Sequence, residues 1–272
     1  MTVTDRSDPR GRVADHLRSG SGVVRIPYPI GIRTLTLLNR TEITPCMLRL
    51  TLGGPGLDGF HSYQADDHIR IVFPDPDGTL RVPVPNDRQM LDWPRPFPIT
   101  RQYTVRRWDP DTRELDLDFV LHDGGVASEW ARRAAIGEDV IVAGPPGAKV
   151  FPLTYDHYIL AVDATGLPAA ARWLEEAGDD ISADLVVETD EAVEHDYPLP
   201  ERAGVTVHRL IRDGRPSALA DTVTALPLPA GRVLLFAAGE ADDIKPLRAW
   251  HKDRTDASFT GYWKRGVAGL DD

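Results

Sequence analysis

The chain has almost no cysteine: Cys46 is the single one in 272 residues. One thiol cannot close an internal disulfide, and an iron–sulfur cluster needs four protein ligands. The eight histidines show no paired spacing and no carboxylate partner in a helical register, so no resident zinc or non-haem iron site is expected. Any electron transfer must therefore use a bound organic cofactor, or a metal that arrives with the substrate.

Long apolar runs are also missing. No stretch approaches the ~20 residues that a helix needs to span a bilayer, so insertion into a membrane is not expected. The first thirty residues contain charges, glycine and serine without the apolar core of a signal peptide. We expect a flexible arm over residues 1–30 and a cytoplasmic protein. The formal net charge of −11 disfavours nucleic acid as a partner, because phosphate binding needs a basic face.

The first half of the chain has the pattern of antiparallel sheet. One helix is expected over residues 128–135, and residues 102–108 and 115–121 should form a hairpin around the turn at 109–112. A few short strands with a single helix indicate a small barrel. The expected strands are 35–38, 47–52, 68–73, 102–108, 115–121 and 139–143.

The pattern changes after Gly144-Pro145-Pro146-Gly147, because two prolines between glycines end a strand. We therefore expect one domain over 31–147 and a second over 148–272. Continuous apolar runs alternate with helical segments in the second domain, as in a parallel α/β fold that binds its ligand at the carboxyl ends of its strands. The expected strands are 158–162, 185–187, 205–207 and 233–237, and the expected helices are 167–177, 217–225 and 242–252.

Residues 101–104 and 125–128 together have the order of a flavin-binding site. Arg101, Tyr103 and Thr104 share one strand, and a turn with Gly125 and Ser128 opens the next helix. A guanidinium group matches a pyrophosphate, a phenol ring can stack on the flavin, and a hydroxyl can bond the polar edge of the flavin ring. Backbone N–H groups at the helix N-terminus favour the same pyrophosphate. Either element alone also fits a purely structural role; the two in this order indicate a flavin.

The chain resembles the siderophore-interacting proteins, flavin-dependent ferric-siderophore reductases within the ferredoxin-reductase-like group. The resemblance extends from Arg33 to Gly266, and its closing Gly-Tyr-Trp motif is absent from ordinary flavin reductases. The motifs that carry it are Arg101-Gln102-Tyr103-Thr104, Asp118-Phe119-Val120-Leu121-His122, Gly125-Val126-Ala127-Ser128 with Trp130, Asp163-Ala164-Thr165-Gly166-Leu167-Pro168, Ala238-Gly239-Glu240 and Gly261-Tyr262-Trp263-Lys264-Arg265-Gly266.

The resemblance implies an N-terminal antiparallel FAD-binding β-barrel followed by a C-terminal parallel-sheet NAD(P)-binding domain. Tyr103 and Thr104, beside the flavin ring, are the candidate catalytic residues. The family usually has proline where this chain has Val126, and glutamate where it has Ala164; the second departure puts any role of that glutamate in doubt. The residues implied to bind FAD are Arg101, Gln102, Tyr103, Thr104, Phe119, Val120, Leu121, His122, Gly125, Ala127 and Ser128.

The implied electron donor is NADH or NADPH, bound near Thr165 and Glu240. An arginine after the second strand favours NADPH, and a carboxylate there favours NADH. The acidic run 188–194 follows that strand and favours NADH, although a solvated acidic loop explains the run equally well. Arg209 and Arg212, one strand later, favour NADPH. A ferredoxin is a third candidate donor.

The implied acceptor is a ferric siderophore, which releases its iron as Fe(II) because oxygen ligands hold Fe(II) less tightly. Lys245, Lys264 and Arg265, with Trp263, are the candidate residues for an anionic acceptor; a basic strand that balances an acidic protein explains them equally well. Two other functions stay open: a general NAD(P)H:flavin or ferredoxin reductase with another acceptor, and a non-catalytic siderophore-binding module. The siderophore and the oligomeric state also stay open.

Overall fold

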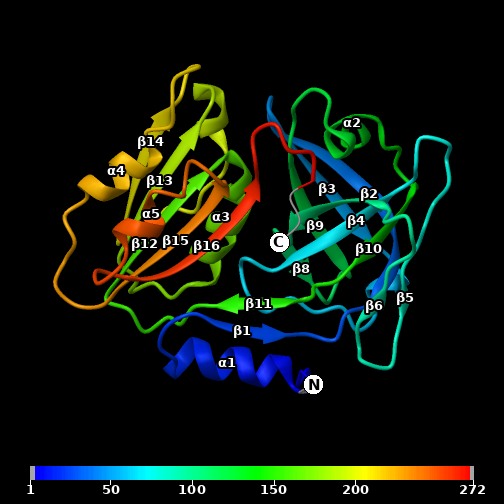
Figure 1. Cartoon of the computed structure of the whole chain (residues 1–272), viewed down its shortest axis with the longest axis horizontal. Helices are drawn as coiled ribbons and strands as arrows, with labels where there is room; N and C mark the ends of the chain where they lie inside the picture. Colours follow the sequence, from blue (N-terminus) through cyan, green and yellow to red (C-terminus); the bar gives the residue numbers. More distant parts are fainter. Residues whose placement is uncertain (1–3, 270–272) are drawn as a thin grey trace. The chain divides into compact units, whose positions relative to one another are not determined.

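The computed structural model describes residues 4–269, which fold into two compact units. The first comprises the chain up to residue 14 with 24–42 and 47–150, and the second comprises 15–23, 43–46 and the chain from 151 onward. The main boundary between the two units comes after Val150. The sequence predicts this boundary three residues earlier, after Gly147. Each unit is built around one main sheet (Figure 1).

The first unit is mainly antiparallel sheet, as expected. Seven of its strands form one sheet in the order β7-β4-β10-β2-β3-β9-β8. The elements in chain order are β1 (Val24–Pro27), β2 (Ile32–Thr44), β3 (Met47–Gly53), the 3-10 helix η1 (Pro55–Leu57), β4 (His68–Phe73), β5 (Val84–Pro85), β6 (Leu91–Asp92), β7 (Ile99–Thr104), β8 (Arg107–Asp109), β9 (Glu114–Val120), α2 (Val126–Arg133), β10 (Asp139–Ala143) and β11 (Gly147–Val150).

This sheet curls on itself. Tyr103 of β7, the first strand in the order, packs its ring against Phe119 of β9, the sixth strand, with ring centroids 4.0 Å apart. Side chains at every second position of a strand point to the same face, and Leu35 and Leu37 of β2 are buried together with Leu50 of β3 inside the curl. The expected barrel is therefore a curled antiparallel sheet, a half-barrel.

The expected hairpin between residues 102–108 and 115–121 is only partly correct. β7 pairs with β4, and only the short β8 pairs with β9. The chain changes partner at two residues: the N–H of Val105 donates to Asp67 O (2.8 Å), and the N–H of Arg106 donates to Asp116 O (2.9 Å). Hydrophobic alternation shows which face of a strand is buried, but it does not identify the neighbouring strand.

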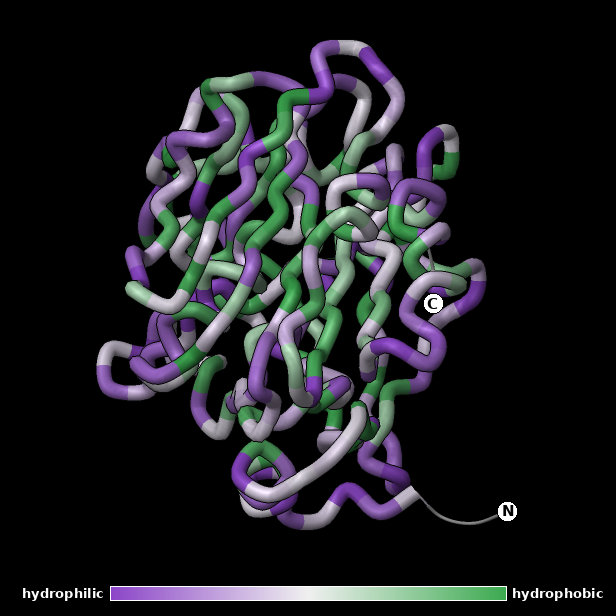
Figure 2. Tube along the Cα trace, turned by 90° about the vertical axis from the view of Figure 1, so that its left-hand side faces the viewer, coloured by the Kyte–Doolittle hydropathy of each residue, from purple (hydrophilic) through white to green (hydrophobic). Residues whose placement is uncertain are grey.

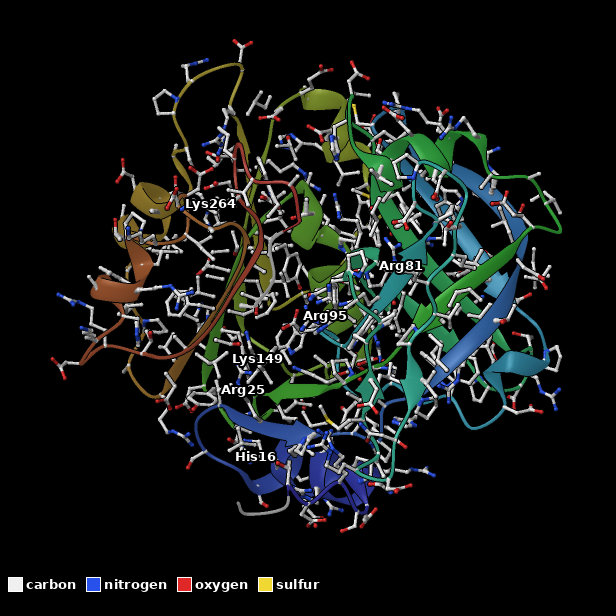
Figure 3. All side chains as sticks on the ribbon, turned by 45° about the vertical axis from the view of Figure 1, so that its right-hand side comes forward. His16, Arg25, Arg81, Arg95, Lys149 and Lys264 are labelled. Atoms are coloured by element: carbon white, nitrogen blue, oxygen red, sulfur yellow. The ribbon has the colours of Figure 1, made fainter. Side chains whose placement is uncertain are left out.

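Regular structure also occurs in the first thirty residues, where a flexible arm is expected. Helix α1 spans Pro9–Ser19, and β1 pairs with β11 in an antiparallel ribbon. In this ribbon Arg25 lies directly opposite Lys149, and both are labelled in Figure 3. Like charges in this position weaken a strand pair. Its backbone hydrogen bonds and the buried Ile26 favour the ribbon instead.

The second unit is a parallel α/β domain, as expected, with the strand order β14-β13-β12-β15-β16. Figure 2 shows hydrophobic residues along these strands and hydrophilic residues in the loops. The elements are β12 (His157–Asp163), η2 (Ala164–Gly166), α3 (Leu167–Glu176), β13 (Ala183–Thr189), η3 (Ala192–Asp196), β14 (Val205–Ile211), α4 (Leu219–Ala225), β15 (Val233–Glu240), α5 (Leu247–Trp250) and β16 (Asp256–Trp263).

Both faces of this sheet are covered, which explains its continuous apolar strands. On one face, Tyr158 of β12 packs on Trp173 of α3, with centroids 4.9 Å apart. On the other face, Ile159 belongs to a core cluster with Leu219 of α4 and Leu247 of α5. Successive residues of one strand therefore contact helices on opposite sides.

The helix expected over 242–252 is much shorter, since α5 covers Leu247–Trp250 alone. The N–H groups of Asp242 and Asp243 donate to the Glu240 carboxylate (2.7 and 2.8 Å) and form a turn instead. Pro246 then disfavours a helical conformation at the residue before it. Residues 242–246 therefore form a turn bonded to the Glu240 side chain in place of the first helical turns.

A buried ion pair links β3 to β9 beside the residues of the flavin motif. Arg49 Nε and Nη2 donate to Asp118 Oδ1 and Oδ2 (2.7 and 2.8 Å), and the Asp118 side chain is completely buried. We expect Asp118→Ala to lower the free energy of unfolding by about 1.5–3 kcal/mol, because it leaves the Arg49 guanidinium without these two acceptors. Denaturant unfolding measures the change. Asp58→Ala breaks the exposed pair with Arg113 (3.3 Å) and should cost about 0–1 kcal/mol; equal losses would contradict the assignment.

Candidate functional site

The flavin strand of the sequence is β7, which ends one edge of the curled sheet. Strand alternation places Arg101 and Tyr103 on one face and Gln102 and Thr104 on the other. The face with Tyr103 is the core face, since Tyr103 lies opposite the buried Ile69 of β4. Arginine and aromatic ring therefore point the same way, and the threonine hydroxyl lies at the carboxyl end of the strand.

The polar groups of this strand are available to a ligand. Arg101 donates from Nη1 to Thr100 O (2.7 Å) and forms no ion pair within residues 4–269. In the same part of the chain, the hydroxyls of Tyr103 and Thr104 have no hydrogen-bond partner. Burial raises the pKa of Tyr103, and the nearby Arg101 opposes this weakly, so the phenol stays protonated and can donate.

Phe119 is completely buried and lies under the Tyr103 ring, so it can contact a flavin through its backbone only. Val120 is the last residue of β9, and Leu121 and His122 continue from it toward α2. Phe119 and Val120 thus lie on the strand that Tyr103 packs against, and Leu121 and His122 lie in the loop after it. Their contact with a flavin stays a prediction.

A hydroxyl links the loop after β9 to helix α2. Ser128 Oγ accepts from the N–H of His122 (2.9 Å) and donates to His122 O (2.8 Å), and Ser128 is almost completely buried. Its hydroxyl is therefore committed to the loop, and Ser128 can contact a phosphate only through its backbone N–H. A side chain at Gly125 would meet the His122 ring at 2.2 Å, so this ring would have to rotate if Gly125 were replaced.

The N-terminus of α2 is open to an anion. Its capping residue, Gly125, provides no side chain, and the N–H groups of Val126, Ala127 and Ser128 have no acceptor within residues 4–269. The first N–H groups of a helix carry partial positive charge and favour phosphate. Together with the arginine fork and the two hydroxyls of β7, these donors fit the phosphates and ring of FAD, so the residues present suit this cofactor.

In the second unit, one partly buried carboxylate joins three strand ends. Asp163, at the end of β12, accepts from the N–H and hydroxyl of Thr165 (2.8 and 2.5 Å), from the N–H of Glu240 (2.8 Å) and from Trp263 Nε1 (2.7 Å). Burial raises the pKa of Asp163, although these four hydrogen bonds act in the opposite direction. Asp163 therefore fixes the Thr165 turn and the Trp263 indole at the carboxyl edge of the sheet.

Glu240, expected near the nicotinamide, is buried, and its carboxylate is occupied by hydrogen bonds within the protein. Its carboxylate accepts from the N–H groups of Asp242, Asp243 and Arg265 (2.7, 2.8 and 2.9 Å). The side chain thus orders the loop after β15 and the residues after β16. Because its carboxylate is already used, Glu240 could contact a nucleotide only through its backbone, and this contact stays a prediction.

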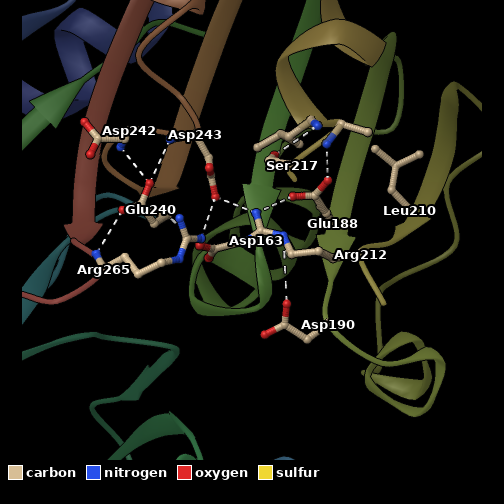
Figure 4. Close-up of polar contacts among 12 residues, drawn as sticks. Asp163, Glu188, Asp190, Leu210, Arg212, Ser217, Glu240, Asp242, Asp243 and Arg265 are labelled. Atoms are coloured by element: carbon tan, nitrogen blue, oxygen red, sulfur yellow. Dashed lines mark hydrogen bonds and ion pairs between the residues drawn. The ribbon is translucent and has the colours of Figure 1, made fainter. Parts of the chain in front are cut away.

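Arg212 lies among three carboxylates beyond the ends of β13 and β14 (Figure 4). It donates to Glu188 (2.7 Å) and Asp243 (2.5 Å), and Asp190 lies 3.9 Å from its Nε. Burial alone would lower the pKa of Arg212, but the bonds to Asp243 and Glu188 outweigh it and raise this pKa. Arg265, 3.3 Å from Asp243, extends the network.

The candidate acceptor-binding cations differ in how they are partnered. Lys264, labelled in Figure 3, pairs with Asp242 (3.3 Å), and Arg265 pairs with Asp243 and lies 5.5 Å from the Trp263 ring centroid. Lys245 is exposed, and its side chain forms no hydrogen bond or ion pair within residues 4–269. Trp263 and Arg265 also line a pocket that Lys245 and Lys264 do not reach. These four residues stay predictions for acceptor binding.

The sequence did not single out the loop 213–217, which lines the same pocket as Arg212 and Trp263. An Asp-Gly pair in a loop after a strand was the available signal, since it marks a tight turn. No helix in the described part of the chain is long and apolar enough to cross a membrane.

Two family models match the chain. The model described as siderophore-interacting FAD-binding domain matches residues 36–149, and the model described as siderophore-interacting protein matches residues 155–266. The NADPH-dependent ferric-chelate reductase of Escherichia coli (strain K12) is 35% identical, over 82% of this chain and 87% of that protein. Ferric vibriobactin reductase ViuB of Vibrio cholerae is 32% identical, over 90% of this chain and 93% of that protein.

Solved structures give the same grouping. A siderophore utilization protein from T. fusca has a TM-score of 0.85 and 38% identity, covering 92% of this chain and 98% of that chain. The ferredoxin reductase in carbazole 1,9a-dioxygenase has a TM-score of 0.62 at 14% identity, over 86% of this chain and 70% of that chain. The second likeness concerns the fold alone, which is ferredoxin-reductase-like.

We call the open N-terminus of α2 together with the donors of β7 the flavin cradle. Two of its residues can be replaced together. We expect Arg101→Ala combined with Ser128→Ala to be purified without FAD, because the change removes the phosphate fork and loosens the loop before α2. Flavin absorbance per mole of protein, after release by denaturation, measures the occupancy. Arg133→Ala, at the other end of α2, is the matched control and should keep its flavin. Full retention in the double variant would refute the cradle assignment.

Replacing the carboxylate at the sheet edge should destabilise the protein in a pH-dependent way. Asp163→Asn replaces one of the two carboxylate oxygens that accept hydrogen bonds. We expect the variant to have a free energy of unfolding about 1–3 kcal/mol below that of the wild type in acid. Because the pKa of Asp163 is raised in the folded state, the wild type loses stability as pH rises above 3.8, the ordinary value, through the folded value. The amide of the variant cannot ionise, so the variant keeps its stability. The difference in free energy of unfolding between variant and wild type should therefore shrink toward neutral pH.

Denaturant unfolding at several pH values measures this difference. Asp242→Asn is the control, since Asp242 is about half exposed and pairs with Lys264 at the surface. A deficit for Asp163→Asn that grows as pH rises would contradict the burial argument.

Proposed function

The chain belongs to the siderophore-interacting protein family, and on that premise we propose that it is an FAD-dependent reductase that passes electrons from NAD(P)H to ferric siderophores and releases Fe(II). The observation that carries the proposal is the flavin cradle: the open N-terminus of α2 with the free donors of β7. The second unit supports it with a parallel sheet whose carboxyl edge holds Asp163 and Trp263 in fixed positions.

FAD accepts a hydride from a nicotinamide and can release its electrons singly, as Fe(III) requires. In our proposal, Arg101 and the N–H groups of Ala127 and Ser128 bind its phosphates. Tyr103 and Thr104 lie along the ring and ribityl chain, and their hydroxyls donate to its polar edge. The residues proposed to contact FAD through the backbone or beside it are Gln102, Phe119, Val120, Leu121, His122 and Gly125.

The donor is proposed to bind along the carboxyl edge of the parallel sheet, near Thr165 and Glu240. Asp163 and Glu240 hold this edge through hydrogen bonds within the protein, so they position other groups. A ferredoxin as donor would need no pocket for a nucleotide; the pocket beside Trp263 therefore favours NAD(P)H.

The acceptor is proposed to bind near Lys245, Lys264 and Arg265, with Trp263 as an apolar wall. The nearby Asp242 and Asp243 balance part of this charge, so a multiply charged anion is favoured over a singly charged one. No protein ligand to iron is required, because the siderophore carries the metal as substrate. We place the reaction in the cytoplasm.

Anaerobic turnover tests the function. We expect the purified protein to be yellow, to be bleached by NADPH or NADH, and to regain its colour when a ferric siderophore is added, with ferrozine trapping Fe(II) in the same reaction. Ferric citrate and free flavin serve as comparison acceptors.

Each alternative predicts a different result. A general flavin or ferredoxin reductase would be bleached by nucleotide but would stay reduced in the presence of ferric siderophores. A non-catalytic binding module would take up siderophore and would not be bleached. Either outcome overturns the proposal.

A further inference from the structure

A pocket of about 520 Å³ lies at the carboxyl edge of the second unit. Its wall includes Asp190, which follows β13, the loop 212–217, which follows β14, and Trp263, at the end of β16. In doubly wound sheets the residue that distinguishes a free ribose 2′-hydroxyl from a 2′-phosphate follows the second strand, here β13. The pocket therefore lies where NADH and NADPH differ.

The acidic run after β13 does not make this pocket negative. Glu188 is buried and accepts from Arg212 and from the N–H of Ala218 (2.6 Å). Glu194 is buried as well and accepts from the N–H groups of Asp190 and Glu191 (both 2.9 Å). Two of the carboxylates that favoured NADH in the sequence are thus used inside the protein.

Of the two arginines in the loop, only Arg215 is free to bind a ligand. Arg212 has 13% of its side chain exposed and is held by Glu188 and Asp243. Arg215 has 75% of its side chain exposed, and its one ion pair in the described part of the chain is with Asp213, itself 79% exposed, at 3.6 Å. A pair this exposed contributes about 0–1 kcal/mol, so a phosphate can replace the carboxylate.

A rigid turn presents Arg215 to the pocket. Asp213 and Gly214 both have positive φ (47° and 72°), and the N–H of Arg215 donates to Arg212 O (2.9 Å), as in a type I′ turn. The turn is fastened to β13, because the N–H of Arg212 donates to Thr189 O (2.8 Å). The guanidinium therefore sits on a fixed backbone beside the end of the second strand.

A hydroxyl on the same loop completes the donor set. Ser217 Oγ accepts from the N–H of Leu219 (3.2 Å), and its own O–H has no acceptor within residues 4–269. An arginine fork with a neighbouring hydroxyl is a typical phosphate-binding pair. The pocket wall carries Arg212, Arg215 and Arg265 against Asp190 and Asp243. Because Arg212 and Arg265 pair with Glu188 and Asp243, the cation available to a ligand is Arg215.

We infer that Arg215 and Ser217 bind the 2′-phosphate of NADPH and make this enzyme NADPH-selective. Arg212 stabilises the loop through Glu188 and Asp243 and does not bind the phosphate. The inference rests on the proposed function for its nicotinamide donor, and it reverses the preference for NADH that the acidic run alone indicates.

Binding of nucleotide fragments tests the inference without turnover. We expect the wild-type holoenzyme to bind 2′,5′-ADP at least about tenfold more tightly than 5′-AMP in isothermal titration calorimetry. Arg215→Ala should weaken 2′,5′-ADP about 10- to 100-fold and leave 5′-AMP unchanged. In steady state the same variant should raise KM for NADPH and leave KM for NADH and both kcat values unchanged.

Arg18→Ala is the matched control for this variant. Arg18 is 74% exposed and pairs with an exposed carboxylate nearby in the chain, Asp15, so the substitution removes the same charge from a similar surface environment. It lies outside the pocket wall and should leave both fragments unaffected. Equal effects of Arg18→Ala and Arg215→Ala, or equal binding of the two fragments by the wild type, would overturn the inference.

Asp190→Asn provides a second, independent test. Of the two carboxylates in the wall, Asp243 is held by Arg212 and Arg265, so Asp190 is the one that could accept from a free 2′-hydroxyl. If the pocket reads a phosphate, the variant should bind 2′,5′-ADP as tightly as the wild type or more tightly, through loss of repulsion. Weaker binding of 5′-AMP with unchanged 2′,5′-ADP would mean that the pocket selects NADH.

The two proposals fail separately. Flavin that is bleached equally well by NADPH and NADH would remove the inference and leave the reductase function intact. Selective binding of 2′,5′-ADP by a protein whose flavin neither nucleotide bleaches would leave the phosphate site and remove the proposed function.

Discussion

The carboxyl edge of the second unit depends on one partly buried carboxylate, Asp163. Parallel strands are joined along their length by backbone bonds, but their ends diverge, and the loops after them have no partner in the sheet. Asp163 gives three such ends a common acceptor, through Thr165, Glu240 and Trp263. The Gly-Tyr-Trp motif is thereby attached to the turn after β12, a hundred residues earlier in the chain. The cost is a carboxylate that burial makes harder to ionise.

In the first unit the equivalent constraint is the curl of the sheet. It brings the edge strand β7 over β9, so the Tyr103 ring rests on Phe119 and residues with no backbone pairing become neighbours. The donors of the edge strand β7 and the open N-terminus of α2 both follow from the local sequence. Edge strands leave backbone groups unpaired and are costly unless covered, and a bound flavin is one way to cover them.

The sequence predicted the fold class, the change from antiparallel to parallel sheet, helix α3 and a strand over residues 102–104, because these depend on local periodicity and on short motifs. It could not predict that β7 pairs with β4, since alternation carries no information on partners. Nor could it reveal that Glu188 and Glu194 are used internally, because Glu188 contacts Arg212 and Ala218 far along the chain. Helix α1 was missed because its one buried residue, Val13, gives almost no amphipathic pattern.

The turn at Asp213 and Gly214 has a consequence for how such an enzyme changes its donor. Its conformation is set by backbone hydrogen bonds and by the two residues at positive φ, none of which involves the side chain at position 215. That side chain can therefore be exchanged without repacking the core or redirecting the loop. With Arg215 in its proposed role, coenzyme preference is a nearly independent trait, which could be changed at this single exposed position while the electron-transfer machinery stays the same.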